Sequence, residues 1–433
     1  MDRTQDRRRV ERGIEYEPLE SQARFHKSHS RFKGFSGSIG SGKSQALCQE
    51  AIKLAYLNAG RVGLIGAPTY PMLRDATLTS LTEVLERNRL PFDLNKSENV
   101  LTLRDTRSRI LLRSVDEFER LRGTNLAWFG LDELSYTPEE SWLRLEGRLR
   151  DPKATRLCGF AVWTPKGHDW VWRKFIENPV SGYDVVLAKP FENEHILGVI
   201  PDFYERLKAS YDERFYRQEV LGEYLNADSG RVYHSFIRAD HVVESRIEYG
   251  LPLLWALDFN VDPMCSVVAQ KQGDIMVVVD EIVLSRASTY QACEEFWNRF
   301  RQHSGGVVVY GDASGQSTRT TGSTDYQLIR EYFSRTPYRT LEYRVPKSNP
   351  AVRDRVLMVN AMMRTASGAI QMSISPKCKE LIKILTVVYK AGSTVIDKER
   401  DPKRTHLSDA LGYLIWQESR STVQFGEQHR RLL

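Results

Sequence analysis

The residues from 37 to 44 have the types and spacing needed to bind phosphate groups. Their sequence, GSIGSGKS, is the phosphate-loop pattern Gly-x-x-x-x-Gly-Lys-Ser. Glycines in such a loop let main-chain N–H groups turn inward around an anion. The lysine of the pattern contacts the β- and γ-phosphates, and the serine hydroxyl holds Mg²⁺. A plain flexible loop is the alternative. The pattern predicts that ATP binds at Gly37, Ser38, Ile39, Gly40, Ser41, Gly42, Lys43 and Ser44.

Two consecutive carboxylates, Asp132 and Glu133, follow the apolar run LAWFGL downstream of this loop. A phosphate loop needs such a pair, because hydrolysis of ATP requires a metal ligand and a general base. Asp132 would bind the Mg²⁺ of the nucleotide, and Glu133 would polarise the attacking water. The simpler interpretation is that the pair only caps the following helix.

Three further features could complete the nucleotide site. The amide of Gln22 could pair with the adenine edge while Phe25 stacks on the base; a plain amphipathic helix would give the same spacing. Arg122 could stabilise the γ-phosphate charge, in cis or from a neighbouring subunit, or could instead contact DNA. Thr164 ends an apolar run, where it could sense the γ-phosphate or simply begin a turn.

Three aspartates in the second half could form a different centre. Asp258 and Asp312 end apolar runs, and Asp409 begins a helical pattern. Oxygen-only ligands select Mg²⁺ or Mn²⁺, and two such ions can cleave a phosphodiester. Each aspartate could also be an ordinary turn or cap residue. Nearby alternatives are Asp262, Asp280, His406 and Glu281, the last as a possible fourth acid.

The elements around these residues predict an α/β chain with two domains. Apolar runs alternate with helical patterns over 31–198, which predicts a phosphate-loop ATPase domain with a mainly parallel sheet. Residues 249–420 begin with a hairpin and continue as α/β, the order of a ribonuclease-H-like nuclease domain with a mixed sheet. The remaining segments are a charged lead-in with the adenine-side motif at 1–30, a helical connector at 199–248 and a flexible tail at 421–433.

Composition narrows the class of protein. The formal net charge of +6 is compatible with a nucleic-acid partner. The five cysteines are scattered and form no C-x-x-C pair, which argues against a zinc module or a disulfide framework. No run of apolar residues is long enough to cross a membrane, and the charged start lacks the apolar region of a secretory signal.

From about residue 16 to 417 the chain resembles the large terminase subunit of tailed bacteriophages. The resemblance rests on motifs in the family's order: GSIGSGKS, APTYPMLRDA, RLRGTNLAWFGLDEL, WTPKGHDW, EVLGEY, DFNVDP, GDASG and HLSDALGY. It implies a motor ATPase joined to a ribonuclease-H-like nuclease, which packages double-stranded DNA into a procapsid and cuts the concatemer. It also implies a small terminase subunit and a portal protein as partners, a homo-oligomeric ring (a pentamer during packaging), and a place in the host cytoplasm, transiently on the procapsid.

The resemblance assigns roles to the residues already singled out. Lys43 and Ser44 would contact phosphate and Mg²⁺, Asp132 and Glu133 would form the acidic pair, and Thr164 would belong to the coupling motif. Nuclease metals, Mg²⁺ or Mn²⁺, would bind Asp258, Asp312 and Asp409. Many members carry an arginine inside the phosphate loop and this chain does not, which favours Arg122 acting in trans.

A motor that moves DNA of any base sequence must contact the DNA phosphates rather than the bases. A helicase or remodeller with a non-catalytic second half, and a nucleotide switch without turnover, are the rival interpretations. Basic residues that could grip or guide DNA, or merely be solvated, are Arg104, Arg107, Arg109, Arg144, Arg148, Arg150, Lys347, Arg353 and Arg355.

Overall fold

The computed structural model describes residues 14–115, 123–225, 231–260, 262–318, 322–336, 341–386 and 405–422. These residues form two compact units. The first contains the described residues up to Pro201 together with Gln218–Leu225. The second contains Asp202–Arg217 and the described residues from 231 onward.

The first unit is built on an eight-stranded sheet with the order β3-β4-β5-β2-β6-β7-β1-β8. All pairs from β5 to β8 are parallel, and β4 alone is reversed, since it pairs antiparallel with both β3 and β5. The predicted mainly parallel sheet is therefore confirmed. The strands are β1 (Phe32–Ser36), β2 (Val62–Ala67), β3 (Phe92–Asn95), β4 (Val100–Leu103), β5 (Arg109–Ser114), β6 (Trp128–Leu131), β7 (Cys158–Trp163) and β8 (Tyr183–Leu187).

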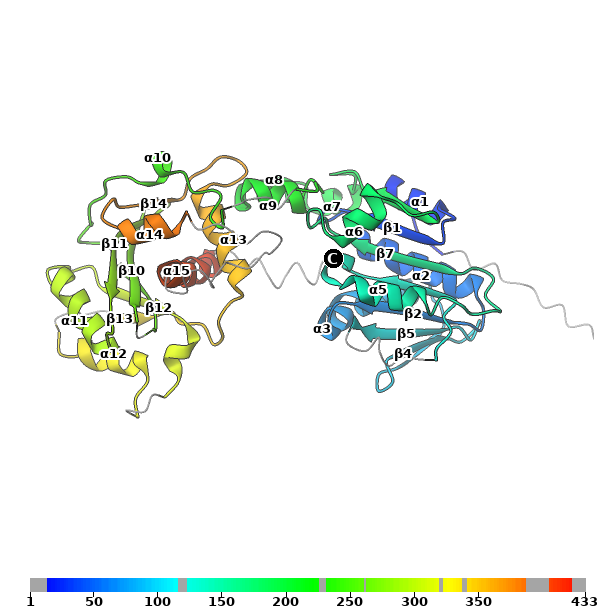
Figure 1. Ribbon diagram of the computed structural model, residues 1–433, viewed down its shortest axis with the longest axis horizontal. Helices are drawn as coiled ribbons and strands as arrows, with labels where there is room; N and C mark the ends of the chain where they lie inside the picture. The colour runs from blue at the N-terminus through cyan, green and yellow to red at the C-terminus, as the bar shows by residue number, and fades with distance from the viewer. Residues whose placement is uncertain are drawn as a thin grey trace, which may run out of the picture. The chain divides into compact units, whose positions relative to one another are not determined.

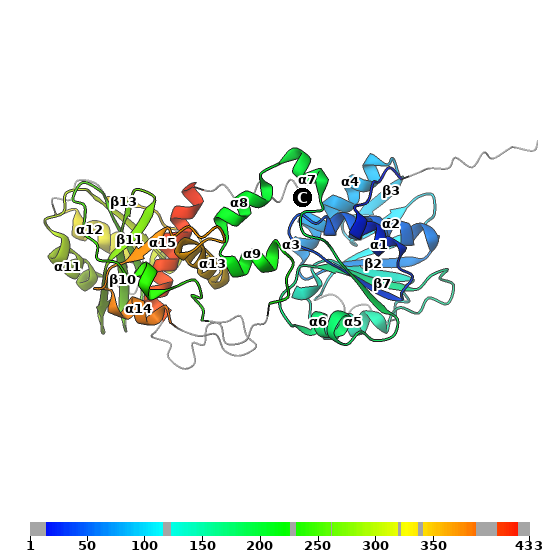
Figure 2. The ribbon, with the colours of Figure 1, turned by 90° about the horizontal axis from the view of Figure 1, so that it is seen from above.

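Helices cover both faces of this sheet (Figure 2). One core packs α1, α2 and α4 against the sheet, and a second core packs α5 and the segment after α6 against the other face. Apolar residues at every position of β6 and β7 follow from this double cover, since both faces of a central parallel strand are buried. The helices are α1 (Glu20–Lys27), α2 (Lys43–Leu57), α3 (Tyr70–Met72), α4 (Thr79–Arg87), α5 (Glu139–Glu146), α6 (Trp170–Trp172) and α7 (Glu194–Val199).

The second unit contains a six-stranded mixed sheet with the order β13-β12-β9-β10-β11-β14. The strands β9, β10 and β11 are antiparallel neighbours, whereas β12 and β13 run parallel to β9. This arrangement confirms the predicted ribonuclease-H-like layout. The strands are β9 (Leu253–Asp258), β10 (Met264–Gln272), β11 (Ile275–Leu284), β12 (Val307–Gly311), β13 (Leu341–Tyr343) and β14 (Met372–Ile374).

The two faces of the second sheet carry different helices. One core joins the sheet to α13, α14 and α15, and the other joins it to α11 and α12. In Figure 1, α15 lies beside β10 and β12. The bounds are α11 (Thr289–Phe300), α12 (Asp325–Phe333), α13 (Val352–Met363), α14 (Lys379–Ile384) and α15 (His406–Thr422).

Along the chain, the described residues between β8 and β9 include three further helices, α8 (Phe203–Ser210), α9 (Glu213–Glu219) and α10 (Arg238–His241). The chain enters the second unit at Asp202, returns to the first for Gln218–Leu225, and then goes back to the second. We call Gln218–Leu225 the return segment. In the part of the chain that the structure describes, no helix is long and apolar enough to span a membrane.

Candidate functional sites

Three of the predicted segments meet at one edge of the first sheet. The strands β1, β7 and β6 are consecutive parallel neighbours, so their carboxyl ends lie side by side. The phosphate loop follows β1, Thr164 follows β7, and Asp132 with Glu133 follows β6. Ligands of open parallel sheets bind at this edge, which makes it the candidate nucleotide site.

The phosphate loop has the backbone of an anion cradle. Gly40 and Gly42 both have φ of 76°, which glycine adopts without a steric penalty. A Cβ atom on Gly37 would lie 2.3 Å from the hydroxyl oxygen of Ser41, so a larger residue here would displace the Ser41 side chain. The Lys43 ammonium donates to the carbonyls of Gly37 at 3.1 Å and Ser38 at 2.9 Å. Lys43 also begins α2, so the loop sits at a helix N-terminus, where anions bind.

Ile39 of the loop is bonded to a segment outside the loop, and its predicted contact with ATP stays a prediction. The main-chain N–H of Ile39 donates to the Glu219 carbonyl at 2.7 Å, so this N–H is committed to the return segment. Ile39 therefore ties the loop to the return segment.

The adenine-side prediction is partly wrong. Phe25 is fully buried between Phe35 and Phe160 in the core, so it cannot stack on a base. Gln22 is also buried; its amide nitrogen donates to the Gly42 carbonyl at 2.9 Å, and its oxygen accepts from the Leu19 N–H at 2.9 Å. Gln22 therefore supports the phosphate loop, and an adenine contact by its remaining amide hydrogen stays a prediction.

Asp132 is a buried, hydrogen-bonded carboxylate. The Thr77 hydroxyl donates to one oxygen at 2.7 Å, and the Glu133 N–H donates to the other at 3.0 Å. Burial and the charge of Glu133 raise the pKa of Asp132 to about 6, while the Lys43 charge opposes the shift. Glu133 has φ of 49°, an unusual conformation for a residue with a side chain and one that is common at functional sites. Thr77 was missed because nothing in its sequence context marks it.

Two contacts connect the ends of these strands. The Ser135 hydroxyl donates to the Thr164 carbonyl at 2.8 Å, which links the acidic segment to the end of β7. On the other side, the Tyr224 hydroxyl is 2.6 Å from the hydroxyl of Ser36 and accepts from the indole N–H of Trp163 at 2.8 Å. Ser36 and Trp163 are the last residues of β1 and β7, so Tyr224 of the return segment holds both strand ends. Arg122 lies outside the described residues.

The second unit brings the three predicted aspartates together. Asp258 ends β9, Asp312 directly follows its parallel neighbour β12, and Asp409 lies in the first turn of α15, which packs across both strands. Burial raises the pKa of Asp258; the hydrogen bond from His406 opposes this, and the charges of Asp409 and Asp312 add to it. The carboxylates of Asp409 and Asp312 therefore lie close enough to act on that of Asp258.

Each carboxylate is already hydrogen-bonded. An oxygen of Asp258 is 2.8 Å from Nδ1 of His406. Asp312 accepts from the Gly315 N–H at 3.1 Å, and Asp409 accepts from the Arg355 guanidinium at 2.8 Å. Within the described residues, no group of three or more His, Cys, Asp or Glu side chains is arranged to hold a metal ion. The all-oxygen donor set fits Mg²⁺ or Mn²⁺ by its chemistry, but two of its members are paired with basic side chains.

The alternative acids have other partners. Both carboxylate oxygens of Glu281 accept main-chain N–H groups at the start of α14, from Glu380 at 2.9 Å and Leu381 at 2.8 Å. Asp280 pairs with Arg299 at 3.1 Å. His406 contacts Asp258 directly.

The basic residues predicted to contact DNA differ in exposure. Arg353 is exposed on α13, but Arg355 is buried against α15, so the prediction that Arg355 guides DNA is wrong. Arg104 is exposed and pairs with Asp93 at 2.5 Å.

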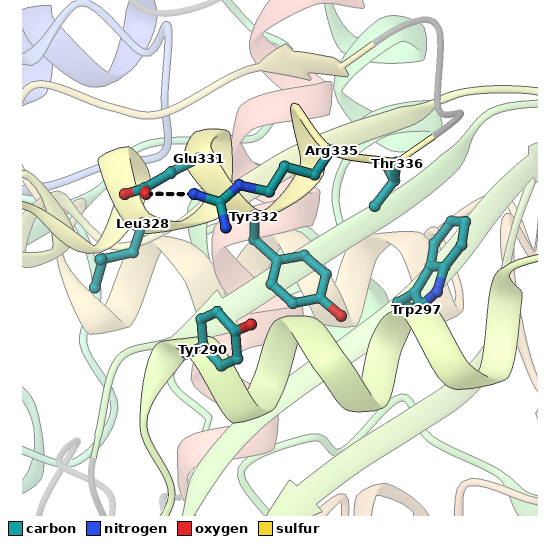
Figure 3. A pocket seen from close by; sticks show the side chains of 7 residues that line it. All are labelled: Tyr290, Trp297, Leu328, Glu331, Tyr332, Arg335 and Thr336. Carbon is teal, nitrogen blue, oxygen red and sulfur yellow. Dashed lines mark hydrogen bonds and ion pairs between the residues drawn. The ribbon is translucent and has the colours of Figure 1, made fainter.

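The second unit also has a pocket of about 350 Å³, and none of the three aspartates lines it. It opens between α11 and α12, which cover the sheet face opposite to α15 (Figure 3). Its walls are Tyr290, Trp297, Leu328, Glu331, Tyr332, Arg335 and Thr336.

The chain was compared with protein families, curated proteins and solved structures. The family described as terminase large subunit, T4likevirus-type, N-terminal, matches residues 35–239. The large terminase subunits of Thermus virus P23-45 and Thermus phage G20c are each 27% identical over 216 residues, which is 46% of this chain and 43% of theirs. The chain thus spans less than half the length of these curated relatives.

The fold is that of a solved large terminase. The large terminase of the thermophilic bacteriophage D6E matches with a TM-score of 0.66 and 16% identity, over 95% of this chain and 100% of that one. The same protein solved in complex with ADP matches with a TM-score of 0.63 over 94% and 100%. The resemblance to large terminase subunits that the sequence motifs predict is confirmed.

Proposed function

We propose that this chain, with its resemblance to large terminase subunits, is a viral DNA-packaging motor. It hydrolyses ATP to move double-stranded DNA into a procapsid, and it cuts concatemeric DNA at a metal-dependent endonuclease site. The observation that carries the proposal is that one chain has two separate carboxylate-bearing sheet edges. One lies beside a phosphate loop, and the other holds three aspartates and no phosphate loop.

The first edge supports ATP hydrolysis. A bound triphosphate would take the two donors that Lys43 now gives to the carbonyls of Gly37 and Ser38. Ser44 and Asp132 would hold Mg²⁺, which neutralises the phosphate charge. Glu133, directly beyond the buried Asp132, would accept the proton of the attacking water.

Coupling to DNA movement would start at the contacts between strand ends. A change at the acidic segment would reach Thr164 through its hydrogen bond from Ser135. Arg122 remains our candidate for a transition-state cation supplied by a neighbouring subunit.

The second edge supports phosphodiester cleavage. Asp258, Asp312 and Asp409 would hold Mg²⁺ or Mn²⁺, ions that activate water and stabilise the leaving oxygen. His406 would orient Asp258, because its Nδ1 lies 2.8 Å from a carboxylate oxygen. The short turn after Asp312 would fix that side chain through the Gly315 N–H.

The partners follow from the resemblance. We propose contact with DNA phosphates, with a small terminase subunit and with the portal protein of a procapsid. The protein would act as a pentameric ring in the host cytoplasm, transiently docked on the procapsid.

The test measures both activities in the full chain. ATP hydrolysis with double-stranded DNA and Mn²⁺-dependent nicking of supercoiled plasmid are compared for wild type, Lys43→Ala and Asp312→Ala. Matched controls are Lys96→Ala and Asp274→Ala, because both side chains are exposed in hairpin turns. We expect Lys43→Ala to lose only hydrolysis and Asp312→Ala to lose only cleavage.

Each proposed activity can fail separately. Cleavage that persists in Asp312→Ala, or is absent from wild type, overturns the nuclease site and favours a helicase or remodeller. Nucleotide binding without turnover in wild type favours a switch.

A further inference from the structure

The Arg355 side chain is buried beside a carboxylate of the nuclease site. Its Nη1 donates to the Asp409 carboxylate at 2.8 Å and lies 3.3 Å from the Asp409 carbonyl. The two side chains are only 7% and 11% exposed, so little water screens the pair. Removing one member of such a pair leaves an uncompensated buried charge.

Three residues of helix α15 pack against the Arg355 side chain. Gly412 lies in the interior of α15, where glycine disfavours the helix relative to alanine. A Cβ atom on Gly412 would lie 3.1 Å from the Cβ of Arg355 and 3.4 Å from its Cδ, so the glycine makes room for the arginine stem. The guanidinium lies 4.3 Å from the ring centroid of Tyr413, one turn beyond Asp409. Three neighbouring positions of α15 therefore accommodate one side chain of α13.

Helix α13 carries a second arginine that differs from Arg355 in exposure. Arg353 lies two residues earlier on α13 and is exposed, whereas Arg355 points inward. The Nε atom of Arg355 is buried and has no hydrogen-bond partner. A residue that recognised DNA would expose its donors, so burial of Arg355 indicates a role inside the carboxylate cluster.

We propose that Arg355 is the internal counter-ion of Asp409 and that it sets the affinity of the nuclease site for its divalent cation. The inference rests on the proposed nuclease function. Without metal, the guanidinium compensates a carboxylate that lies close to two others. A divalent cation that binds Asp409 must share or displace this contact, because both cations attract the same carboxylate. Arg355 is therefore a positioning residue that lowers metal affinity.

Coulomb's law gives the sign of the effect. Replacing Arg355 by methionine keeps a long stem over Gly412 and Tyr413 but removes one positive charge beside the site. The metal then meets a more negative cluster and no competitor for Asp409. We expect Arg355→Met to bind Mn²⁺ about tenfold more tightly than wild type, or more.

The experiment measures Mn²⁺ affinity of the full chain without DNA, by calorimetry and by electron paramagnetic resonance of free Mn²⁺. Arg353→Met is the matched control, because it removes the same charge from the exposed side of the same helix. Arg355→Lys keeps the charge. Both should stay within about twofold of wild type, since exposed charges are screened and the retained ammonium still competes.

The remaining outcomes decide for or against the proposal. Unchanged or weaker Mn²⁺ binding by Arg355→Met overturns it, as does an equal gain in Arg353→Met. If neither wild type nor any variant binds Mn²⁺, the nuclease assignment itself fails. If Arg355→Met folds only when Mn²⁺ is added, the metal replaces the counter-ion, as proposed. If it does not fold even with Mn²⁺, Arg355→Gln is measured against the same criteria.

Discussion

Ser135 and Thr164 are joined by a hydrogen bond of 2.8 Å from the serine hydroxyl to the threonine main-chain carbonyl. The bond connects the segment after β6 to the segment after β7, at the candidate nucleotide site. The segment that carries the proposed water-polarising acid, Glu133, is therefore linked to the proposed coupling residue by one hydroxyl group.

Ser135→Ala should weaken coupling while leaving nucleotide binding intact. The loss of one hydrogen bond, about 1 kcal/mol, should lower DNA-stimulated ATP hydrolysis about fivefold. Parallel measurements of ATP affinity and turnover separate the two effects. Ser97→Ala, which removes a hydroxyl bonded to Asn95 in an exposed turn, should change neither. Equal turnover in wild type and Ser135→Ala would show that this bond transmits nothing.

Gly37→Ala should abolish nucleotide binding. Its Cβ would lie 2.3 Å from the Ser41 hydroxyl oxygen, so the Ser41 side chain must move and give up its 2.7 Å hydrogen bond to the Ser38 carbonyl inside the loop. The measurement is ATP affinity by fluorescence or calorimetry, with circular dichroism to verify folding. Gly198→Ala is the control, because a Cβ there meets no atom within 4 Å. Retained affinity in Gly37→Ala would rule out the cradle described for this loop.

Tyr224→Phe should destabilise the first unit. The change removes a hydroxyl bonded to Ser36 and Trp163 but keeps the ring. We expect a loss of about 1–2 kcal/mol in the free energy of unfolding, measured by urea denaturation. Tyr56→Phe removes a hydroxyl bonded to Asp105 at an exposed site and should cost much less. An equal cost for the two variants would contradict the special role of Tyr224.

Glu281→Gln should preserve DNA cleavage. Both oxygens of the carboxylate accept main-chain N–H groups at the start of α14. Glutamine keeps one acceptor, so the free energy of unfolding should fall by about 1 kcal/mol. Asp312→Asn, assayed alongside, should lose cleavage. If both variants lose cleavage with folding intact, Glu281 is a fourth acid of the nuclease site.

Asp212→Asn should change how stability depends on pH. Burial raises the pKa of Asp212 from 3.8 to about 6, so the folded chain retains its proton to higher pH than the unfolded chain. The stability contributed by this proton is complete below pH 3.8 and is lost as pH rises through 6. Relative to Asp212→Asn, wild type should therefore lose about 2 kcal/mol between pH 4.5 and 7.5.

Chemical denaturation at the two pH values tests this prediction. His234 lies 3.4 Å from Asp212, but burial lowers its pKa to about 4, so it is neutral over most of the range. A difference between the two proteins that does not vary with pH would contradict the raised pKa.

The sequence was sufficient to predict those sites whose residue types are required by the local backbone conformation or by the chemistry of the ligand. Gly42 must adopt a positive φ, and Lys43 must begin the following helix, so the loop could be recognised without a fold. Asp258 and Asp312 could be paired because each ends an apolar run, and parallel strands end at one edge.

Residues whose role depends on a distant partner could not be assigned. Phe25 has the spacing of an adenine-stacking residue, but the same spacing places it on the buried face of α1. Arg353 and Arg355 look alike in sequence, and only the packing of α13 on α15 separates an exposed cation from a buried one. Tyr224 contacts strand ends far from it along the chain, and no local pattern predicts such contacts.

The return segment has a consequence for synthesis of the protein. Until residues 219 and 224 have left the ribosome, one native hydrogen bond is missing at each of Ile39, Ser36 and Trp163. By then Asp202–Arg217, which belongs to the other unit, has already been made. Fragments that end near residue 201 would lack these partners, whereas fragments that end after residue 225 would retain them. Neither unit is a continuous stretch of chain, so the two cannot be exchanged between homologues by a single crossover.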